Sequence, residues 1–129
     1  MFHFSATFIH IFAMYKKIRT IVFYKEYFQD FFSLQNDKVK DKIIWTLTLI
    51  EELERISGHY FKYIEGTDGL YEIRLQLGSD ILRIFCFFDS GKLIIIINGF
   101  QKKTQKTPKS EIKMAEKLKK EYLETKYNR

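Results

Sequence analysis

Lysine side chains gather where one hydrophobic stretch of the chain ends. Residues 93–97 are wholly aliphatic, and Lys102, Lys103 and Lys106 follow them among hydroxyl and amide side chains. Residues 101–129 hold 10 basic and 4 acidic side chains, and the difference of 6 equals the net charge of the whole chain. Such an excess is typical either of a solvated helix face or of a surface that binds phosphate groups. Charge alone leaves both readings open.

Two arginines lie on the segments that precede this lysine cluster. Arg74 alternates with Glu72 and Gln76 on the polar side of residues 70–77. Arg83 interrupts residues 81–88, which are otherwise apolar, so its guanidinium must find an anion or reach solvent. A short turn at residues 78–80 would make the two arginines neighbours on adjacent strands. Two roles for Arg83 stay open, an ion pair with Glu72 and a bidentate phosphate contact.

Converging arginines and lysines suit the cleavage of RNA. In that reaction a 2′-hydroxyl attacks the adjacent phosphorus, and fixed cations stabilise the negative charge that develops. A base and an acid are also needed. Glu72, Tyr71 or a lysine with a lowered pKa could serve, whereas His59 reads as an ordinary exposed side chain in a turn. The sequence does not choose among them, and it shows no glycine-rich phosphate loop, metal-ligand cluster or Ser/His/Asp pattern.

Hydrophobic periodicity predicts the elements that must position these side chains. The first half reads as a strand at residues 19–24, a short helix from residue 25, and a long amphipathic helix at residues 38–56. Asn36 or Asp37 would cap that long helix at its start, and Ser57-Gly58 would end it. Two helices joined by so short a turn predict an antiparallel helical hairpin.

The second half of the chain changes to a period of two. Strands are predicted at residues 60–64, 70–77, 81–88 and 92–100, and the last three form an antiparallel meander. Thr107 and Pro108 read as the N-cap and first residue of a final helix. The expected fold is therefore α+β, an antiparallel sheet packed with an N-terminal helical hairpin and a C-terminal helix.

Length and cysteine content limit the domain organisation and the compartment. A chain of 129 residues predicts one domain, and a lone cysteine, Cys86, favours a reducing compartment, hence the cytoplasm. Residues 1–15 carry no Lys, Arg, Asp or Glu, yet they are shorter than the roughly 20 residues of a membrane span. We expect Met14 to be the true start, with residues 1–13 an upstream extension or disordered tail and 14–129 the domain.

Three stretches of the chain resemble a known family. They are EGTDGLYEIRL at residues 65–75, ILRIFCFFDSGKLIIIINGF at residues 81–100, and QKKTQKTPKSEIKMAEKLKKEYL at residues 101–123. The last stretch is the most specific, because basic residues followed by Thr-Pro and a lysine-rich helix look like the family's C-terminal signature. From about residue 18 to residue 123 the chain resembles the phage-derived, HigB-like branch of the RelE/ParE toxin superfamily.

The resemblance implies a RelE-like fold of the microbial ribonuclease type. It also implies the toxin of a type II toxin–antitoxin system that cuts mRNA in the ribosomal A site. Carried over by position, the implied catalytic residues are Arg83, which would stabilise the transition-state phosphate, with Arg74, Lys102 and Lys103. The implied RNA-binding residues are Lys106, Lys109, Lys113 and Glu72. No catalytic tyrosine or histidine stands near the C-terminus, which leaves the acid and the base unassigned.

The implied partners are mRNA, the ribosome and a cognate antitoxin of the HigA-like, helix-turn-helix type. No metal, cofactor or membrane is expected. Two alternatives stay open: a ParE-like toxin that binds DNA gyrase, and a degenerate member that binds only RNA or its antitoxin. Arg83 and the lysine cluster favour the nuclease, because a gyrase binder has no need of a phosphate-stabilising group.

Overall fold

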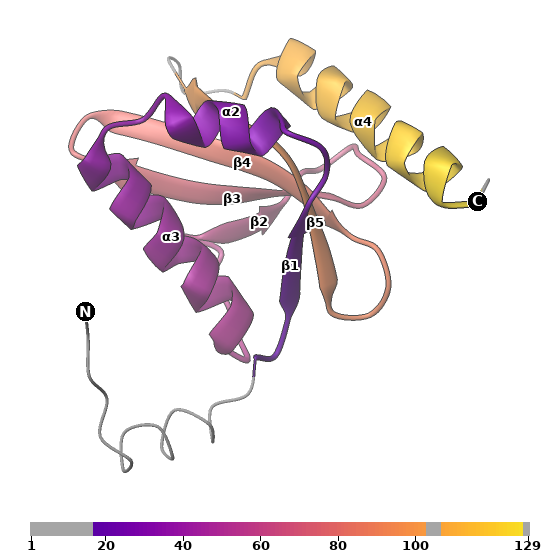
Figure 1. Ribbon diagram of the computed structural model, residues 1–129, viewed down its shortest axis with the longest axis horizontal. Coiled ribbons are helices and arrows are strands. Elements are labelled where there is room, and N and C mark those ends of the chain that lie inside the picture. Colours follow the sequence, from indigo (N-terminus) through magenta and orange to yellow (C-terminus); the bar gives the residue numbers. More distant parts are fainter. Residues whose placement is uncertain (1–16, 103–106, 128–129) are drawn as a thin grey trace.

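A central sheet organises the part of the chain that the computed structural model describes, residues 17–102 and 107–127. Within these residues five strands pair in the order β1-β5-β4-β3-β2 (Figure 1). The strands are β1 (Thr20–Phe23), β2 (Phe61–Tyr63), β3 (Leu70–Leu77), β4 (Asp80–Phe88) and β5 (Leu93–Lys102). The helices are α2 (Tyr27–Ser33), α3 (Asp37–Glu52) and α4 (Lys109–Tyr127). This order confirms the predicted α+β fold, and the predicted extension at residues 1–13 lies outside the described residues.

The sheet is antiparallel from β2 to β5 but parallel at its other edge. The predicted meander β3-β4-β5 is present, with β2 paired antiparallel to β3. Strand β1 instead runs parallel to β5, from Thr20 opposite Leu93 to Phe23 opposite Ile96. The predicted antiparallel sheet is thus found from β2 to β5, and β1 adds a parallel strand to it. No tight turn links β1 to β5, so the alternation of side chains along β1 carries no information about its direction.

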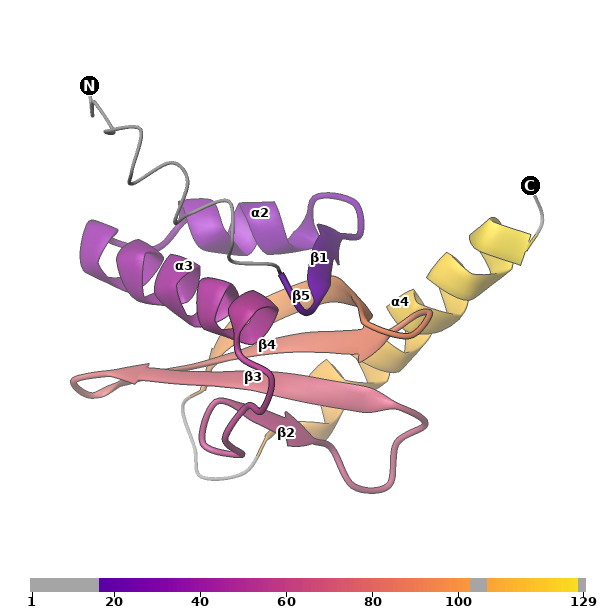
Figure 2. The ribbon, with the colours of Figure 1, turned by 90° about the horizontal axis from the view of Figure 1, so that it is seen from below.

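Helices cover both faces of the sheet. Figure 2 shows α2 and α3 together on one side, where they enclose a core of buried residues including Ile43, Ile73 and Ile84. On the other side, Ala115 and Leu118 of α4 pack against a second core that includes Phe85. The alternation predicted for β3 explains both cores, because successive side chains point to opposite faces. Among residues 17–102 and 107–127, no helix combines the length and apolar character that crossing a membrane requires.

Helix α3 ends four residues before the predicted position, at Glu52 instead of residue 56. Its start is as predicted, since the Asn36 side chain accepts a hydrogen bond from the backbone N–H of Val39. At its other end the Arg19 guanidinium donates to the carbonyl oxygens of Ile50, Leu53 and Glu54, at 3.1, 2.6 and 2.7 Å. A side chain distant in sequence thus satisfies the last carbonyl groups, and the helix needs no glycine there.

The end of α4 is fastened to the β4–β5 turn by one carboxylate. Asp89 accepts hydrogen bonds from the Tyr122 hydroxyl and the Lys126 ammonium, both at 2.6 Å, and its side chain is 4% exposed. The hydrogen bonds from Lys126 and Tyr122 hold the pKa of the Asp89 carboxyl below its ordinary value. The unfolded chain therefore binds a proton more readily than the native protein does, and this stabilising contribution is lost as pH falls through the folded pKa.

Replacing Asp89 with asparagine is expected to lower the free energy of unfolding by about 2 kcal/mol at neutral pH, because a charged hydrogen-bond acceptor is removed. The difference from wild type should shrink once the pH falls below about 4, where the unfolded carboxylate takes up its proton. Urea unfolding at several pH values measures both effects, with the exposed Asp41→Asn as the matched control. A difference that stays constant down to about pH 3 would contradict a role for the charge.

Candidate functional site

Arg74 and Arg83 lie directly opposite each other on β3 and β4. Residues paired in this way have their side chains on the same face of the sheet, and like charges in such a position repel. Arg83 is only 7% exposed. Burial and the neighbouring charge of Arg74 lower the pKa of the Arg83 guanidinium. The structure therefore confirms the predicted pairing of the two strands and brings two cations together, Arg83 nearly buried and Arg74 partly exposed.

Glu72 lies beside both arginines and partly compensates their charge. Its side chain is on the same face of β3 as that of Arg74, and the residue is 8% exposed. One carboxylate oxygen of Glu72 lies 3.5 Å from Nε of Arg74 and 3.8 Å from Nε of Arg83. The structure thus shows the ion pair that was one of the two roles open for Arg83. One negative charge between two positive charges leaves a net positive charge at this point.

The Nε groups of the two arginines form ion pairs with Glu72 but no hydrogen bond in the described part of the chain. Nε of Arg74 and Nε of Arg83 are both buried, and neither has a hydrogen-bond partner among the described residues. Another guanidinium nitrogen of Arg83, Nη1, donates to the carbonyl oxygen of Leu82 at 3.0 Å. A buried donor without a hydrogen bond costs about 1–3 kcal/mol, and here the ion pairs with Glu72 offset part of that cost.

Lys102 adds a third cation on this face. It is the last residue of β5 and pairs with Ile81, which is two residues before Arg83 and therefore on the same side of β4. Burial lowers the pKa of Lys102, and the charge of Arg83 lowers it further. The expectation that Lys102 lies beyond the strand is wrong, because β5 continues to pair with the start of β4. Lys103 and Lys106 lie outside the described residues.

Lys62 is a further cation that the sequence reasoning missed. It pairs with Glu72 across β2 and β3, so it projects from the same face as the two arginines. Its positive charge contributes to the lowered pKa of Lys102. The available signal was its position between Phe61 and Tyr63, since alternation in a short strand sends the lysine to the polar face.

The start of α4 meets this group of charges. Helix α4 begins at Lys109, one residue after the predicted first position at Pro108. The Thr107 hydroxyl donates to the second carboxylate oxygen of Glu72 at 3.2 Å, and the carbonyl of Pro108 accepts a helical hydrogen bond from Ile112. A hydrogen bond to a charged acceptor is stronger than one to a neutral acceptor, so this contact holds the start of α4 against β3. Lys109 and Lys113 follow on the exposed surface of α4.

A small cavity opens next to the arginines at the free edge of β3. It has a volume of about 130 Å³, and its lining residues are Lys42, His59, Tyr60, Arg74, Leu75, Gln76 and Arg83. Strand β2 stops short of this part of β3, so the edge is open there. The structure therefore places His59 beside the arginines. Tyr71, another candidate base, stacks on Phe61 on the opposite face and does not join the site.

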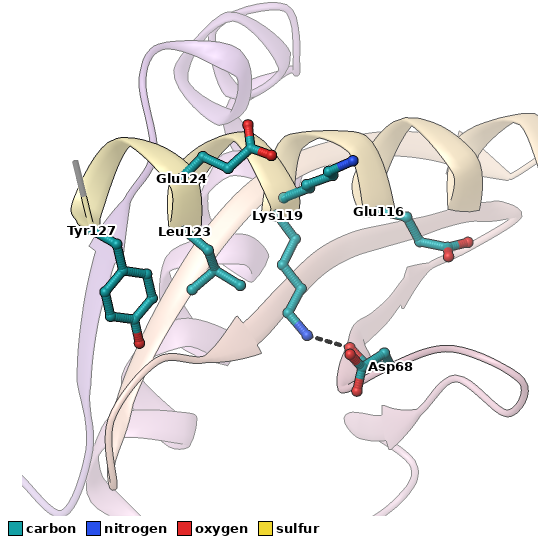
Figure 3. A pocket seen from close by; sticks show the side chains of 7 residues that line it. Asp68, Glu116, Lys119, Leu123, Glu124 and Tyr127 are labelled. Atoms are coloured by element: carbon teal, nitrogen blue, oxygen red, sulfur yellow. Dashed lines mark hydrogen bonds between the residues drawn. The ribbon is translucent and has the colours of Figure 1, made fainter.

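A wider cavity lies elsewhere, along the C-terminal half of α4 (Figure 3). It measures about 560 Å³ and is lined by residues that include Asp68, Glu116, Leu123 and Tyr127. Lys119 crosses it and donates to the backbone carbonyl of Asp68, as the dashed line in Figure 3 marks. None of the predicted site residues lines this cavity. The buried and positively charged side chains of the predicted site therefore lie together on the face of Arg74 and Arg83, away from this cavity.

The charges of the site suit an anion better than a metal ion, because its cationic side chains outnumber its one carboxylate. In the described part of the chain no group of three or more His, Cys, Asp or Glu side chains could hold a metal. The Cys86 thiol is buried on the face opposite Arg83, and burial raises its pKa. The side chains of Arg74, Arg83 and Lys102 can bind a phosphate group and stabilise added negative charge on it, while Glu72 positions the two arginines.

Comparison with known protein families gives one match. Residues 30–120 match the model of the family described as "Phage derived protein Gp49-like (DUF891)". The matched stretch covers more than half of the chain and includes Glu72, Arg74, Arg83 and Lys102. No curated protein matches the sequence. The family match thus contains the whole group of charges that the structure brings together.

Proposed function

The chain belongs to the phage-derived Gp49-like family, part of the RelE/HigB-like toxin superfamily, and we propose on that premise that it is an mRNA endoribonuclease. In this proposal the protein is the toxin of a type II toxin–antitoxin pair and cuts messages while they are on the ribosome. The observation that carries the proposal is the cross-strand pair of Arg74 and Arg83 with Lys102 on the same face, where Arg83 is 7% exposed and Glu72 offsets only part of the positive charge.

A phosphate of the message would accept hydrogen bonds from the two arginines. The 2′-oxygen of the preceding ribose attacks the phosphorus, and the bond from phosphorus to the 5′-oxygen of the next nucleotide breaks. The products are a 2′,3′-cyclic phosphate and a 5′-hydroxyl. Negative charge grows on the phosphate oxygens during this step, so fixed guanidinium groups stabilise the transition state more than the ground state.

Two of the side chains can move the protons of this reaction. Lys102 has a lowered pKa and lies on the face of Arg83, so it can give a proton to the departing 5′-oxygen more readily than an ordinary lysine. His59 lines the same cavity as the arginines and can accept the proton of the 2′-hydroxyl. Glu72 is held by two arginines and Thr107, which makes it a positioning residue for Arg74 and Arg83.

The partner that neutralises the toxin would be a cognate antitoxin of the HigA-like, helix-turn-helix type. The face formed by Lys62, Arg74, Arg83 and Lys102 is positively charged, so an acidic helix or strand of the antitoxin fits it by charge complementarity. Lys109 and Lys113 would extend the same surface along α4, and Lys103 and Lys106 are proposed as RNA-contacting residues from the sequence alone. An antitoxin found bound far from Arg83 would contradict this part of the proposal.

The experiment that tests the function is primer extension on cellular mRNA after brief induction of the protein. We expect cuts in translated messages, phased with the codons, and none in messages whose start codon has been removed. Toxicity with intact mRNA would overturn the nuclease proposal. That outcome would favour a toxin that binds DNA gyrase, which a supercoiling assay then checks.

A further inference from the structure

An exposed aromatic cluster lies at the rim of the arginine cavity. Trp45 of α3 is 47% exposed, and its ring meets the edge of Tyr60 with centroids 5.7 Å apart. The ring of His59 meets Tyr60 in the same edge-on manner, at 5.0 Å. The ammonium group of Lys42 lies over the Trp45 ring, 4.4 Å from its centroid. Three rings and a cation thus gather on one small surface.

This cluster is continuous with the arginine pair. Lys42, His59 and Tyr60 line the same cavity as Arg74 and Arg83. The backbone also connects them, because the N–H of Arg74 donates to the carbonyl oxygen of Tyr60 at 2.8 Å. A ligand phosphate held by the arginines would therefore lie beside the rings, at a separation that the β3 backbone keeps constant.

The packing of α3 does not require a tryptophan at this position. The helix buries Val39, Ile43 and Ile50 against the sheet, and Trp45 lies off that stripe. It is the chain's single tryptophan. Exposed rings flanked by lysine and arginine are the combination by which proteins bind single-stranded nucleic acid, with bases stacked on the rings and phosphates on the cations.

We propose that Trp45 and Tyr60 form a stacking subsite for one RNA base, next to the phosphate that Arg74 and Arg83 hold, with Lys42 contacting the backbone. This inference rests on the proposed function and names the part of the message that the protein itself reads. The rings stack on any base, but purines offer more surface, so the subsite should make cutting depend on the base that occupies it.

The first test is a fluorescence titration, which the single tryptophan makes possible. The probe is a short single-stranded oligoribonucleotide with 2′-O-methyl groups, which cannot be cut because its 2′-oxygen carries no proton and is blocked. We expect it to quench Trp45 fluorescence, and Tyr60→Leu to weaken binding about ten-fold, as the loss of one stacked ring implies. Tyr127→Leu is the control, since Tyr127 is 76% exposed and lies in a different cavity.

The result that overturns the subsite is an absence of quenching up to millimolar oligonucleotide, or equal affinities for wild type and Tyr60→Leu. Circular dichroism verifies that each variant is folded. Trp45→Ala serves as a second variant, and because it lacks the single tryptophan, its binding is measured by the fluorescence anisotropy of a labelled probe. Loss of affinity in both variants but not in Tyr127→Leu supports the subsite.

Cleavage mapping separates this inference from the proposed function. If both hold, Trp45→Ala and Tyr60→Leu still cut mRNA, but with a changed preference for the base beside the cut. Wild-type cutting that depends on Arg83 but is identical in the two ring variants would overturn the subsite and leave the nuclease standing. If the wild type cuts no mRNA, the proposed function fails, and the titration alone decides the subsite.

Discussion

Replacing Arg83 with alanine is expected to abolish toxicity and to reduce mRNA cleavage by at least about a hundred-fold, because one fixed cation at the reacting phosphate is lost. The side chain is nearly buried beside a second arginine, so little solvent screens its action on a bound phosphate. The measurement is primer extension across one translated message, with wild type and variant induced side by side.

The variant should remain folded, because Glu72 keeps Arg74 and Thr107 as partners when Arg83 is removed. Arg55→Ala is the matched control, since Arg55 is exposed at the end of the helical hairpin, and it should cut like wild type. Arg83→Lys keeps the charge but not the planar pair of donors, so we expect an intermediate loss. Full toxicity of Arg83→Ala would show that the protein acts by another route, such as binding to gyrase.

Replacing Glu72 with glutamine is expected to lower the free energy of unfolding by about 3 kcal/mol, because two arginines are then left together without a counter-charge. Glutamine keeps the shape of the side chain and can still accept a hydrogen bond from Thr107. The decrease in the free energy of unfolding therefore reports the effect of removing the charge alone, and urea unfolding at neutral pH measures it. Inorganic sulfate should restore part of the lost stability, since an anion bound beside the arginine pair supplies a compensating negative charge.

The control for this change is Glu65→Gln, in the exposed turn that follows β2. It should leave the unfolding curve unchanged, and sulfate should stabilise it no more than wild type. Equal stability of Glu72→Gln and wild type would mean that the two arginines do not depend on Glu72. A loss that sulfate fails to reduce would argue against an anion site at the arginine pair.

Much of the fold could be predicted because its signals are local. The alternation in residues 70–77 depends on the period of a strand, and the stripe through Val39 and Ile43 depends on the period of a helix. The short turn before β4 also determined the pairing of its neighbours, so Arg74 and Arg83 could be matched before the structure was known. Arg83 could be identified as a candidate site residue from a local signal too, because it is a charged residue within an otherwise apolar stretch.

Other features depended on partners that lie far apart in the sequence. Helix α3 ends at Glu52 because Arg19 reaches its last carbonyl groups, some thirty residues away along the chain. Strand β1 runs parallel to β5, a partner some seventy residues away along the chain. Thr107 donates to Glu72, a carboxylate on β3 that is 35 residues away in the sequence. Residue patterns within one segment contain none of these contacts.

The sequence by itself determined the order of the elements, the two faces of the central strands, and the arginine and lysine types that suit a phosphate. The tertiary structure decided which of these groups converge. It brought Lys62 and Lys102 to the arginine pair and set Trp45 beside Tyr60, which lines the cavity. The physical reason is that periodicity records which side of a segment is buried, whereas a site requires distances between segments, and these arise only when the sheet and helices pack together.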